Sequence, residues 1–477
     1  GLRAARKRLE ALDADEIQFQ QQLIRGSVAA RHLSTAVSYT PEDPSQLHGE
    51  HSSGNQELLG ADSYCAEAFK IGEELWATAI HDRKGRPEWL GMDLGADGES
   101  FHFGLIGSSL YSGTSGIGVL LAKLAQVCQA RGDAAGAALW RQRAWSTLAP
   151  LADLAERKDS AQLFRLVRDL PYGIAGSGGI LLTLNLLMEV GLGDAAPLAN
   201  QLIAQLRRER VLADQGLDVI SGITGLIGPL LQLGSAEALS LAFICGERLL
   251  ESQLESGGWP QANVRKPALT GFSHGAAGMA AALARLAQAT DQDRFAAAAQ
   301  RAVAYERSVY VAASGNWPDF RSTSEPLQFM LSWCHGAPGI LLSRLVLRAS
   351  GLADGACESE LAAARSSTTT ALETLSGKVK PGPAHLCCGD FGLTSLLRID
   401  ALISGCPLPP IVAQVESTQV GQAQINRHYT FFSVDSGSLN LPGLLTGKAG
   451  VALALLEAVD GQRWVPQVLS AGLLEMG

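Results

Sequence analysis

Short, almost wholly apolar runs rich in Leu and Ala recur along the chain. Each run follows a turn of small residues and contains few β-branched residues, so it predicts a helix rather than a strand. Because the runs are apolar on nearly all sides, the predicted helices are buried. They cover residues 117–124, 180–187, 226–233, 279–286, 340–347, 393–397 and 451–456.

The turns before these runs contain paired glycines at a regular spacing. The pairs are 113/116, 173/176, 222/225, 275/278, 336/339, 389/392 and 447/450, and successive second glycines are 49 to 61 residues apart. A period in this range indicates a repeat architecture. Glycine allows close approach of backbones at the start of each helix, so these turns could also serve packing alone.

Between the apolar runs lie amphipathic stretches with charges at helical spacing, typical of helices with one face in water. Clear examples are residues 133–148, 194–209, 235–254 and 291–310. One buried inner helix and one amphipathic outer helix per unit, repeated seven times, predict an all-α solenoid or a closed α/α toroid. We favour the toroid, with about seven inner and seven outer helices, because closure hides both ends. Its inner-helix starts would then surround a shared bowl.

The N-terminal part of the chain differs from the repeats. Residues 1–35 predict an interdomain helix or the tail of an upstream region. Residues 36–62 include Pro, Gly, Ser and two histidines with few apolar side chains, which is typical of a linker or disordered loop. The repeat domain is expected to span residues 63–477.

Composition narrows the classes of function. The chain has 477 residues, 47% of them hydrophobic, and a net charge of -9 with no cluster of Lys and Arg, so we expect no nucleic-acid partner. No apolar stretch predicts membrane insertion, and no leader pattern is visible, so we expect a cytoplasmic protein.

Three of the eight cysteines form a set. Cys334 lies in a glycine turn, and Cys387 and Cys388 lie together in the next one, so a toroid would place them side by side. Three thiols at two equivalent positions favour one zinc ion over buried free thiols or a vicinal disulfide. His335 and His385 are both near enough in sequence to be a fourth ligand, and the sequence does not decide whether that position is open. Cys128 and Cys245 lie in apolar helices and are assigned to the core.

Two further residues are candidates for proton transfer. His274 directly precedes the glycine pair at 275/278, one unit before Cys334, which favours a general acid or base facing the bowl over an ordinary core histidine. Asp218, in an otherwise apolar segment one unit earlier, could cap a helix or could orient His274 and stabilise its charged form.

Together these motifs resemble the lanthionine synthetase C-like family. The resemblance rests on Leu110-Tyr111-Ser112-Gly113, Asp218-Val219-Ile220-Ser221-Gly222, Ser273-His274-Gly275, Trp333-Cys334-His335-Gly336 and Cys387-Cys388-Gly389. The resemblance runs from about residue 63 to the end. Within the family, the chain most resembles the C-terminal cyclase domain of class II lanthipeptide synthetases. These are bifunctional enzymes with an N-terminal dehydratase part, and residues 1–35 resemble the end of that part.

The resemblance implies an α/α toroid with one zinc ion held by Cys334, Cys387 and Cys388, where Cys388 replaces the more common histidine ligand. It implies catalytic roles for His274 and Asp218. The family's tyrosine after the first zinc cysteine is His335 here, which we include as a second proton carrier, and its arginine four residues before that cysteine is Met330.

The activity implied is zinc-dependent cyclisation of a precursor peptide made of a leader and a dehydrated core. Cysteine thiolates of the peptide would add to dehydroalanine or dehydrobutyrine and form thioether rings. The partners implied are that peptide and the dehydratase domain of the same polypeptide. The alternatives are a zinc-containing module that binds a thiol peptide such as glutathione without turnover, and a prenyltransferase-like thiol alkylase, for which the expected aromatic lining and basic cluster are not found.

Overall fold

The structure is a computed structural model of the chain. It describes residues 2–10, 12–35, 58–94, 101–157, 159–260, 267–321, 326–376, 382–432, 439, 441–461 and 463–475. The predicted linker lies almost entirely outside these residues, at positions 36–57.

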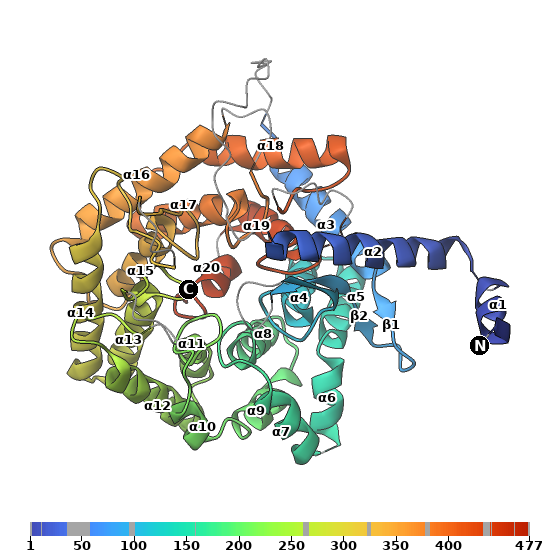
Figure 1. The fold of residues 1–477 in the computed structure, drawn as a ribbon, viewed down its shortest axis with the longest axis horizontal. Coiled ribbons are helices and arrows are strands. Elements are labelled where there is room, and N and C mark those ends of the chain that lie inside the picture. The colour runs from blue at the N-terminus through green and yellow to red at the C-terminus, as the bar shows by residue number, and fades with distance from the viewer. Residues whose placement is uncertain are drawn as a thin grey trace.

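Within the described part of the chain, seven inner helices form a closed ring (Figure 1). Each packs against the next one along the chain, and the last packs against the first, so the ring has no open end. They are α4 (Thr114–Ala130), α8 (Ser177–Glu189), α11 (Thr224–Leu233), α13 (Ala276–Thr290), α15 (Ala337–Ala349), α17 (Asp390–Ser404) and α19 (Lys448–Asp460). Each begins within two residues of the first glycine of its pair, except α8, which begins just after the second. The predicted all-α toroid is confirmed.

The outer layer consists of helices that pack on the inner helix just before them in the chain. They are α5 (Ala134–Ser146), α9 (Ala195–Ile203), α12 (Ala236–Ser252), α14 (Asp293–Val309), α16 (Cys357–Ser376) and α18 (Ile411–Asn426). The seventh outer helix is α3 (Ala61–Ala77), which precedes the first inner helix and packs on α19. The two ends of the repeat region are therefore joined by one helix pair, and the repeat region begins two residues before the expected position 63.

Several elements go beyond the predicted repeat. The expected outer helix at 194–209 is two helices, because α9 ends at Ile203 and α10 (Arg208–Leu212) follows a turn. Helices α6 (Ala149–Glu156) and α7 (Ser160–Arg168) lie between the first and second units. Near the centre of the ring in Figure 1 is α20 (Trp464–Leu469), whose six residues are all buried. The C-terminal segment therefore fills part of the interior.

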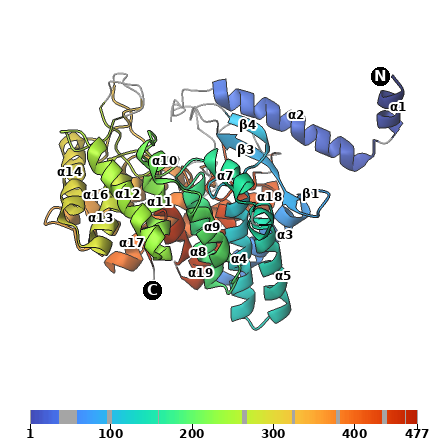
Figure 2. The ribbon, with the colours of Figure 1, turned by 90° about the horizontal axis from the view of Figure 1, so that it is seen from below.

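Two small antiparallel hairpins were not predicted. Strand β1 (Ile80–His81) pairs with β2 (Pro87–Glu88), and β3 (Leu90–Leu94) pairs with β4 (Phe101–Leu105), with Met92 opposite Phe103. Helices α1 (Leu2–Glu10) and α2 (Ala14–Thr35) precede the ring, and α2 lies along the β3–β4 hairpin at the edge of the molecule (Figure 2). None of the described helices is long and apolar enough to cross a membrane.

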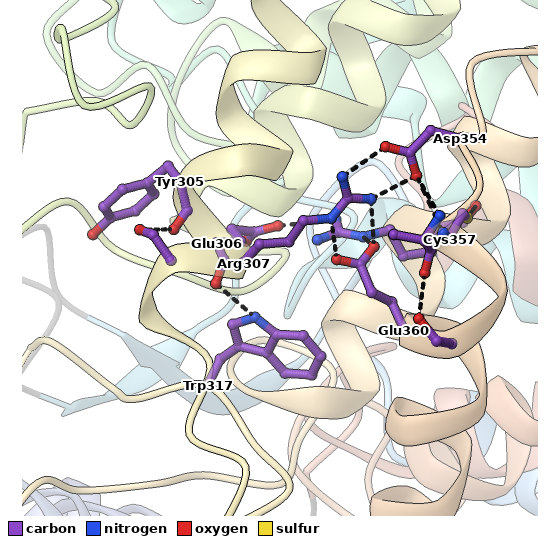
Figure 3. Close-up of polar contacts among 11 residues, drawn as sticks. Tyr305, Glu306, Arg307, Trp317, Asp354, Cys357 and Glu360 are labelled. Atoms are coloured by element: carbon purple, nitrogen blue, oxygen red, sulfur yellow. Dashed lines mark hydrogen bonds and ion pairs between the residues drawn. The ribbon is translucent and has the colours of Figure 1, made fainter.

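A group of ion pairs, buried at Glu306 and Arg344 and exposed at Asp354, joins α14, α15 and α16 (Figure 3). The fully buried guanidinium of Arg344 bonds Glu306 at 2.9 Å and Glu360 at 2.8 Å. Arg307 contacts the same Glu360 at 2.6 Å and Asp354 at 2.6 Å. We call these five residues the ion-pair network. Buried charges of this kind are tolerated because each has an opposite partner.

Candidate metal centre

The three predicted cysteines meet at the N-terminal ends of neighbouring inner helices. Their sulfur atoms all lie within 4.8 Å of one another. The Sγ atom of Cys388 is 3.2 Å from that of Cys334 and 3.2 Å from that of Cys387. These separations are far longer than the ~2.05 Å of a disulfide bond, and all three thiols are free. The structure therefore has no vicinal disulfide between Cys387 and Cys388. We call this group the tri-thiol centre.

Tight turns hold the cysteines in place. Gly336 caps α15 with a φ of 82°, a conformation that side chains disfavour, and a Cβ atom there would be 1.9 Å from the carbonyl oxygen of Met330. At Gly389 a Cβ atom would be 2.3 Å from the carbonyl oxygen of Pro383. The glycines thus allow the chain to fold back directly after the ligand positions.

Backbone hydrogen bonds connect the turns around the ring in two runs. In one, the N–H of Ser273 bonds the carbonyl of Cys334, and the N–H of Val219 bonds the carbonyl of Ser273. In the other, the N–H of Cys387 bonds the carbonyl of Leu445, whose N–H bonds the carbonyl of Tyr111. One series of hydrogen-bonded turns ends at Cys334 and the other begins at Cys387. An ion bound by both cysteines would therefore connect the two series.

His274 and Asp218 form a close pair beside the centre. Nδ1 of His274 is 2.6 Å from Oδ2 of Asp218, while Oδ1 of Asp218 accepts the N–H groups of Ser221 and Gly222. Burial opposes a charge on His274, but the adjacent carboxylate outweighs it and raises the histidine's pKa above its usual value. The same pairing, against the effect of burial, lowers the pKa of Asp218. Asp218 therefore caps its own turn and also orients the histidine, two interpretations that the sequence left as alternatives.

His335 lies in the same region as a buried, neutral side chain. Its ring stacks on that of His274, with centroids 5.9 Å apart and planes 24° apart. Burial lowers the pKa of His335 to about 4. The ring thus packs against the face of the proposed acid, and at neutral pH it carries no charge.

Among the described residues, the group of possible ligand atoms that all lie within 4.8 Å of one another contains the three cysteine sulfurs and no histidine nitrogen. Nδ1 of His385 instead accepts the backbone N–H of Cys388 at 3.1 Å, and burial lowers the pKa of His385 to about 4. His385 therefore holds the turn that carries Cys387 and Cys388. In this geometry neither His335 nor His385 has a ring nitrogen within the group formed by the three sulfur atoms.

Two hydroxyl groups contact the centre and one guanidinium group lies near it, and the sequence assigned a role to none of the three. The Tyr111 hydroxyl donates to Sγ of Cys387 at 2.9 Å, and the Ser332 hydroxyl is 3.2 Å from Sγ of Cys334. Arg321 donates to Sδ of Met330 at 2.8 Å, and its pKa is raised partly by the nearby cysteine thiolates. The position of Tyr111 could have been predicted from the sequence, because Tyr111 lies two residues before a repeat glycine, as Cys334 and Cys387 do. Arg321 lies in a loop outside the repeat pattern, so no sequence pattern predicted its position.

The donor set fits a zinc ion. Hydrogen bonds from the other two thiols lower the pKa of Cys334 well below its usual value, and the same bonds raise the pKa values of Cys387 and Cys388. Within the cluster, Cys334 is thus the thiol that ionises most readily. A soft cation would favour all three as thiolates, and three protein ligands with one position left open are typical of a catalytic zinc site.

The fold and site define a closed helical toroid with a cluster of three thiols that could hold a metal ion at the start of its inner helices. The family model for lanthionine synthetase C-like protein matches residues 105–469. Nisin cyclase is similar in structure, with a TM-score of 0.58 at 18% identity, over 77% of this chain and 94% of its own. An unsaturated glucuronyl hydrolase from Bacillus sp. GL1 reaches only 0.37 at 15% identity, over 66% of this chain and 84% of its own. No curated protein matches the chain.

The match to the family model covers more than half of the sequence. The chain belongs to the lanthionine synthetase C-like family.

Proposed function

We propose that this chain closes thioether rings in a dehydrated precursor peptide. A cysteine thiolate of the peptide would add to the β-carbon of a dehydroalanine or dehydrobutyrine in the same peptide, giving lanthionine or methyllanthionine. Family membership supports the reaction type. The observation that carries the proposal is the tri-thiol centre beside the His274–Asp218 pair, because thiol activation and proton delivery are the two tasks that this addition needs.

Cys334, Cys387 and Cys388 would hold one zinc ion and leave a fourth position for the substrate. Zinc bound there would lower the pKa of a substrate thiol, whose ordinary value near 8.5 leaves only a few per cent as thiolate at pH 7. Thiol ligands at all three positions place more negative charge on the site than a set with a neutral histidine. We expect the substrate sulfur to keep more of its nucleophilicity as a result.

His274 would complete the addition. When the sulfur–carbon bond forms, the carbon–carbon double bond of the dehydro residue opens and its α-carbon becomes an enolate that needs one proton. Because Nδ1 of His274 is held by Asp218, the proton would come from Nε2 of the imidazolium. The thiol proton is lost and one proton is returned, so the product has the mass of the starting peptide.

We further propose that the chain acts next to a dehydratase domain of the same polypeptide, as in class II synthetases. Helices α1 and α2 lie outside the ring and expose apolar side chains, among them Leu2, Leu9, Ile24 and Val28. A polypeptide that carries both domains should dehydrate and cyclise one precursor, while residues 61–477 alone should cyclise only a peptide that is already dehydrated.

The decisive test uses the zinc-loaded chain and a synthetic peptide with one dehydroalanine and one cysteine. We expect the free thiol to disappear without a change in mass, as read by alkylation and mass spectrometry. Retention of the thiol together with tight binding would instead indicate a thiol-peptide binding module and would overturn the proposal.

His274→Asn tests the proton donor in the same assay. General acid catalysis is typically worth 10²–10⁴-fold, so we expect ring formation to slow by about that factor while the zinc content stays near one per chain. His81→Asn, at an exposed position outside the ring, is the matched control and should cyclise normally. An unchanged rate in His274→Asn would remove this residue from the reaction.

A further inference from the structure

The three thiols of the centre have different surroundings. The sulfur of Cys387 is buried and accepts the Tyr111 hydroxyl, whereas Cys388 is the exposed member of the set. A hydrogen bond to a charged acceptor is stronger than one between neutral groups, and a donor outside the ligand set tunes how much charge a ligand keeps. Tyr111 is therefore placed to affect Cys387 and not Cys388.

Tyr111 reaches Cys387 from a turn at the other end of the repeat sequence. The two residues are 276 positions apart. The carbonyl of Tyr111 accepts the N–H of Leu445 at 2.8 Å, and the carbonyl of Leu445 accepts the N–H of Cys387 at 2.9 Å. The hydroxyl contact and this backbone path join the same two residues. Leu110 and Ser112 on either side are buried, so the phenol has little freedom to leave.

The proposed reaction gives this hydrogen bond a purpose. An electrophilic dehydro residue must approach a site with several thiolates, and any protein thiolate that added to it would form a dead-end adduct. A thiolate that accepts a hydrogen bond holds its lone pair more tightly and is a weaker nucleophile. The Cys387 sulfur, which accepts the Tyr111 hydroxyl, should therefore react with the dehydro residue more slowly than the substrate sulfur does.

We propose that Tyr111 is a positioning residue of the metal centre, whose phenol fixes the Cys387 sulfur and suppresses its alkylation so that carbon–sulfur bond formation falls to the substrate thiolate. The proposal rests on the proposed function for its purpose, while the shielding itself is a property of the chain alone. It is tested without any peptide substrate.

The test treats the zinc-loaded protein with iodoacetamide, in which a cysteine sulfur displaces iodide and forms a sulfur–carbon bond. Fragment mass spectrometry then reads the adducts on Cys334, Cys387 and Cys388 separately. In Tyr111→Phe we expect alkylation of Cys387 to be about 5–10-fold faster than in the wild type, the size of effect given by losing one hydrogen bond of typical net strength. Alkylation of Cys388 should change less than twofold.

Two further proteins separate shielding from a merely structural effect. Tyr305→Phe removes another buried tyrosine hydroxyl, which donates to the carbonyl of Ala268 and not to a thiol, and should leave all three rates unchanged. Fluorotyrosine at position 111 is a stronger donor because its phenol is more acidic, so it should slow alkylation of Cys387 below the wild-type rate. Cobalt in place of zinc should show a shifted sulfur-to-metal charge-transfer band in Tyr111→Phe.

The outcomes are distinct. Unchanged alkylation of Cys387 in Tyr111→Phe, or an equal rise at all three cysteines, would overturn the proposal. If Tyr111→Phe loses zinc, the fluorotyrosine protein decides, and no slowing there would also overturn it. If the chain fails to cyclise a dehydrated peptide while Cys387 is still shielded, the proposed function fails and the role of Tyr111 stands.

Discussion

Helix α15 connects two buried polar clusters of opposite character. The turn before it carries Cys334 of the tri-thiol centre, and its second half carries Arg344 of the ion-pair network. In the network, two guanidinium groups face three carboxylates, and burial raises the pKa of one of them, Glu306, to about 7. When Glu306 is protonated, the two positive and two negative charges that remain cancel, so the network approaches zero net charge without a ligand. The tri-thiol centre cannot do so, because its donors are all potential anions, while the positive charge of Arg321 is paired with Asp319 and that of His274 with Asp218.

The difference indicates what each cluster is for. A buried cluster whose charges satisfy one another fixes three helices and offers little to a ligand. A buried cluster of potential anions in tight turns is stable only with protons or a cation, and therefore indicates a binding site. Four changes test this distinction, from the largest expected effect to the smallest.

Arg344→Leu should destabilise the fold most. It leaves Glu306 and Glu360 buried without their shared partner, which typically costs about 3–5 kcal/mol of unfolding free energy. Urea unfolding measures this loss, and zinc per folded chain should stay unchanged. Arg348→Leu, one turn further along α15 with a largely exposed partner, is the control and should cost under about 1 kcal/mol. A loss this small in Arg344→Leu would mean that the network does not hold the helices together.

Removal of zinc should have the next largest effect, and a local one. With free zinc at a hundred times the dissociation constant, binding adds about 2.7 kcal/mol to stability, and a chelator should remove it. Hydrogen exchange should then rise in the turns of Cys334 and Cys387, which an ion would connect, and not around Arg344. Cys334→Ala should unfold at the same temperature with or without zinc. Equal stabilisation of that variant by zinc would place the metal elsewhere.

The sequence predicted the ring and its ligand turns for a physical reason. Buried inner helices need continuous apolar runs, and tight turns need glycine, so both produce a regular pattern in the sequence. Side chains that reach the centre from other elements leave weaker marks. Arg321 comes from a loop whose position depends on packing, and α20 enters the ring through contacts such as the indole N–H of Trp333 with the carbonyl of Leu469. The two hairpins are short, the strands of each pair only with one another, and β3–β4 also packs against α2, so their residues show no long alternation.

Asp218→Asn tests whether the charge on Asp218 sustains the proton donor. The raised pKa of His274 keeps it protonated to higher pH than an ordinary histidine, so activity that needs this proton falls only as pH passes the raised value. Without the carboxylate charge, burial should lower the pKa of His274. We expect cyclisation in the variant to be about 10–100-fold slower than in the wild type at pH 8 and much closer to it at pH 6.

Asp214→Asn is the matched control for that profile. Its carboxylate caps the same turn through the N–H groups of Leu217 and Ile223, and no contact joins it to His274. Its rate relative to the wild type should therefore be the same at both pH values. A flat ratio in Asp218→Asn as well would show that the aspartate only caps its turn.

Glu306→Gln should give the most gradual effect, seen only as a change in the slope of unfolding free energy against pH. The folded-state pKa of Glu306, about 7, lies above the ordinary 4.5, so the folded protein binds more protons than the unfolded one between these values. Its contribution to stability is thus present below about pH 4.5 and lost as pH rises through 7, by at most about 1.4 kcal/mol per pH unit. Glutamine cannot titrate, so the difference in unfolding free energy between wild type and variant should shrink across this window. Urea unfolding from pH 5 to 8, with chelator in both samples to silence the metal centre, measures that difference. A constant difference would mean that Arg344 keeps Glu306 ionised throughout, and the network would then retain a net negative charge as the tri-thiol centre does.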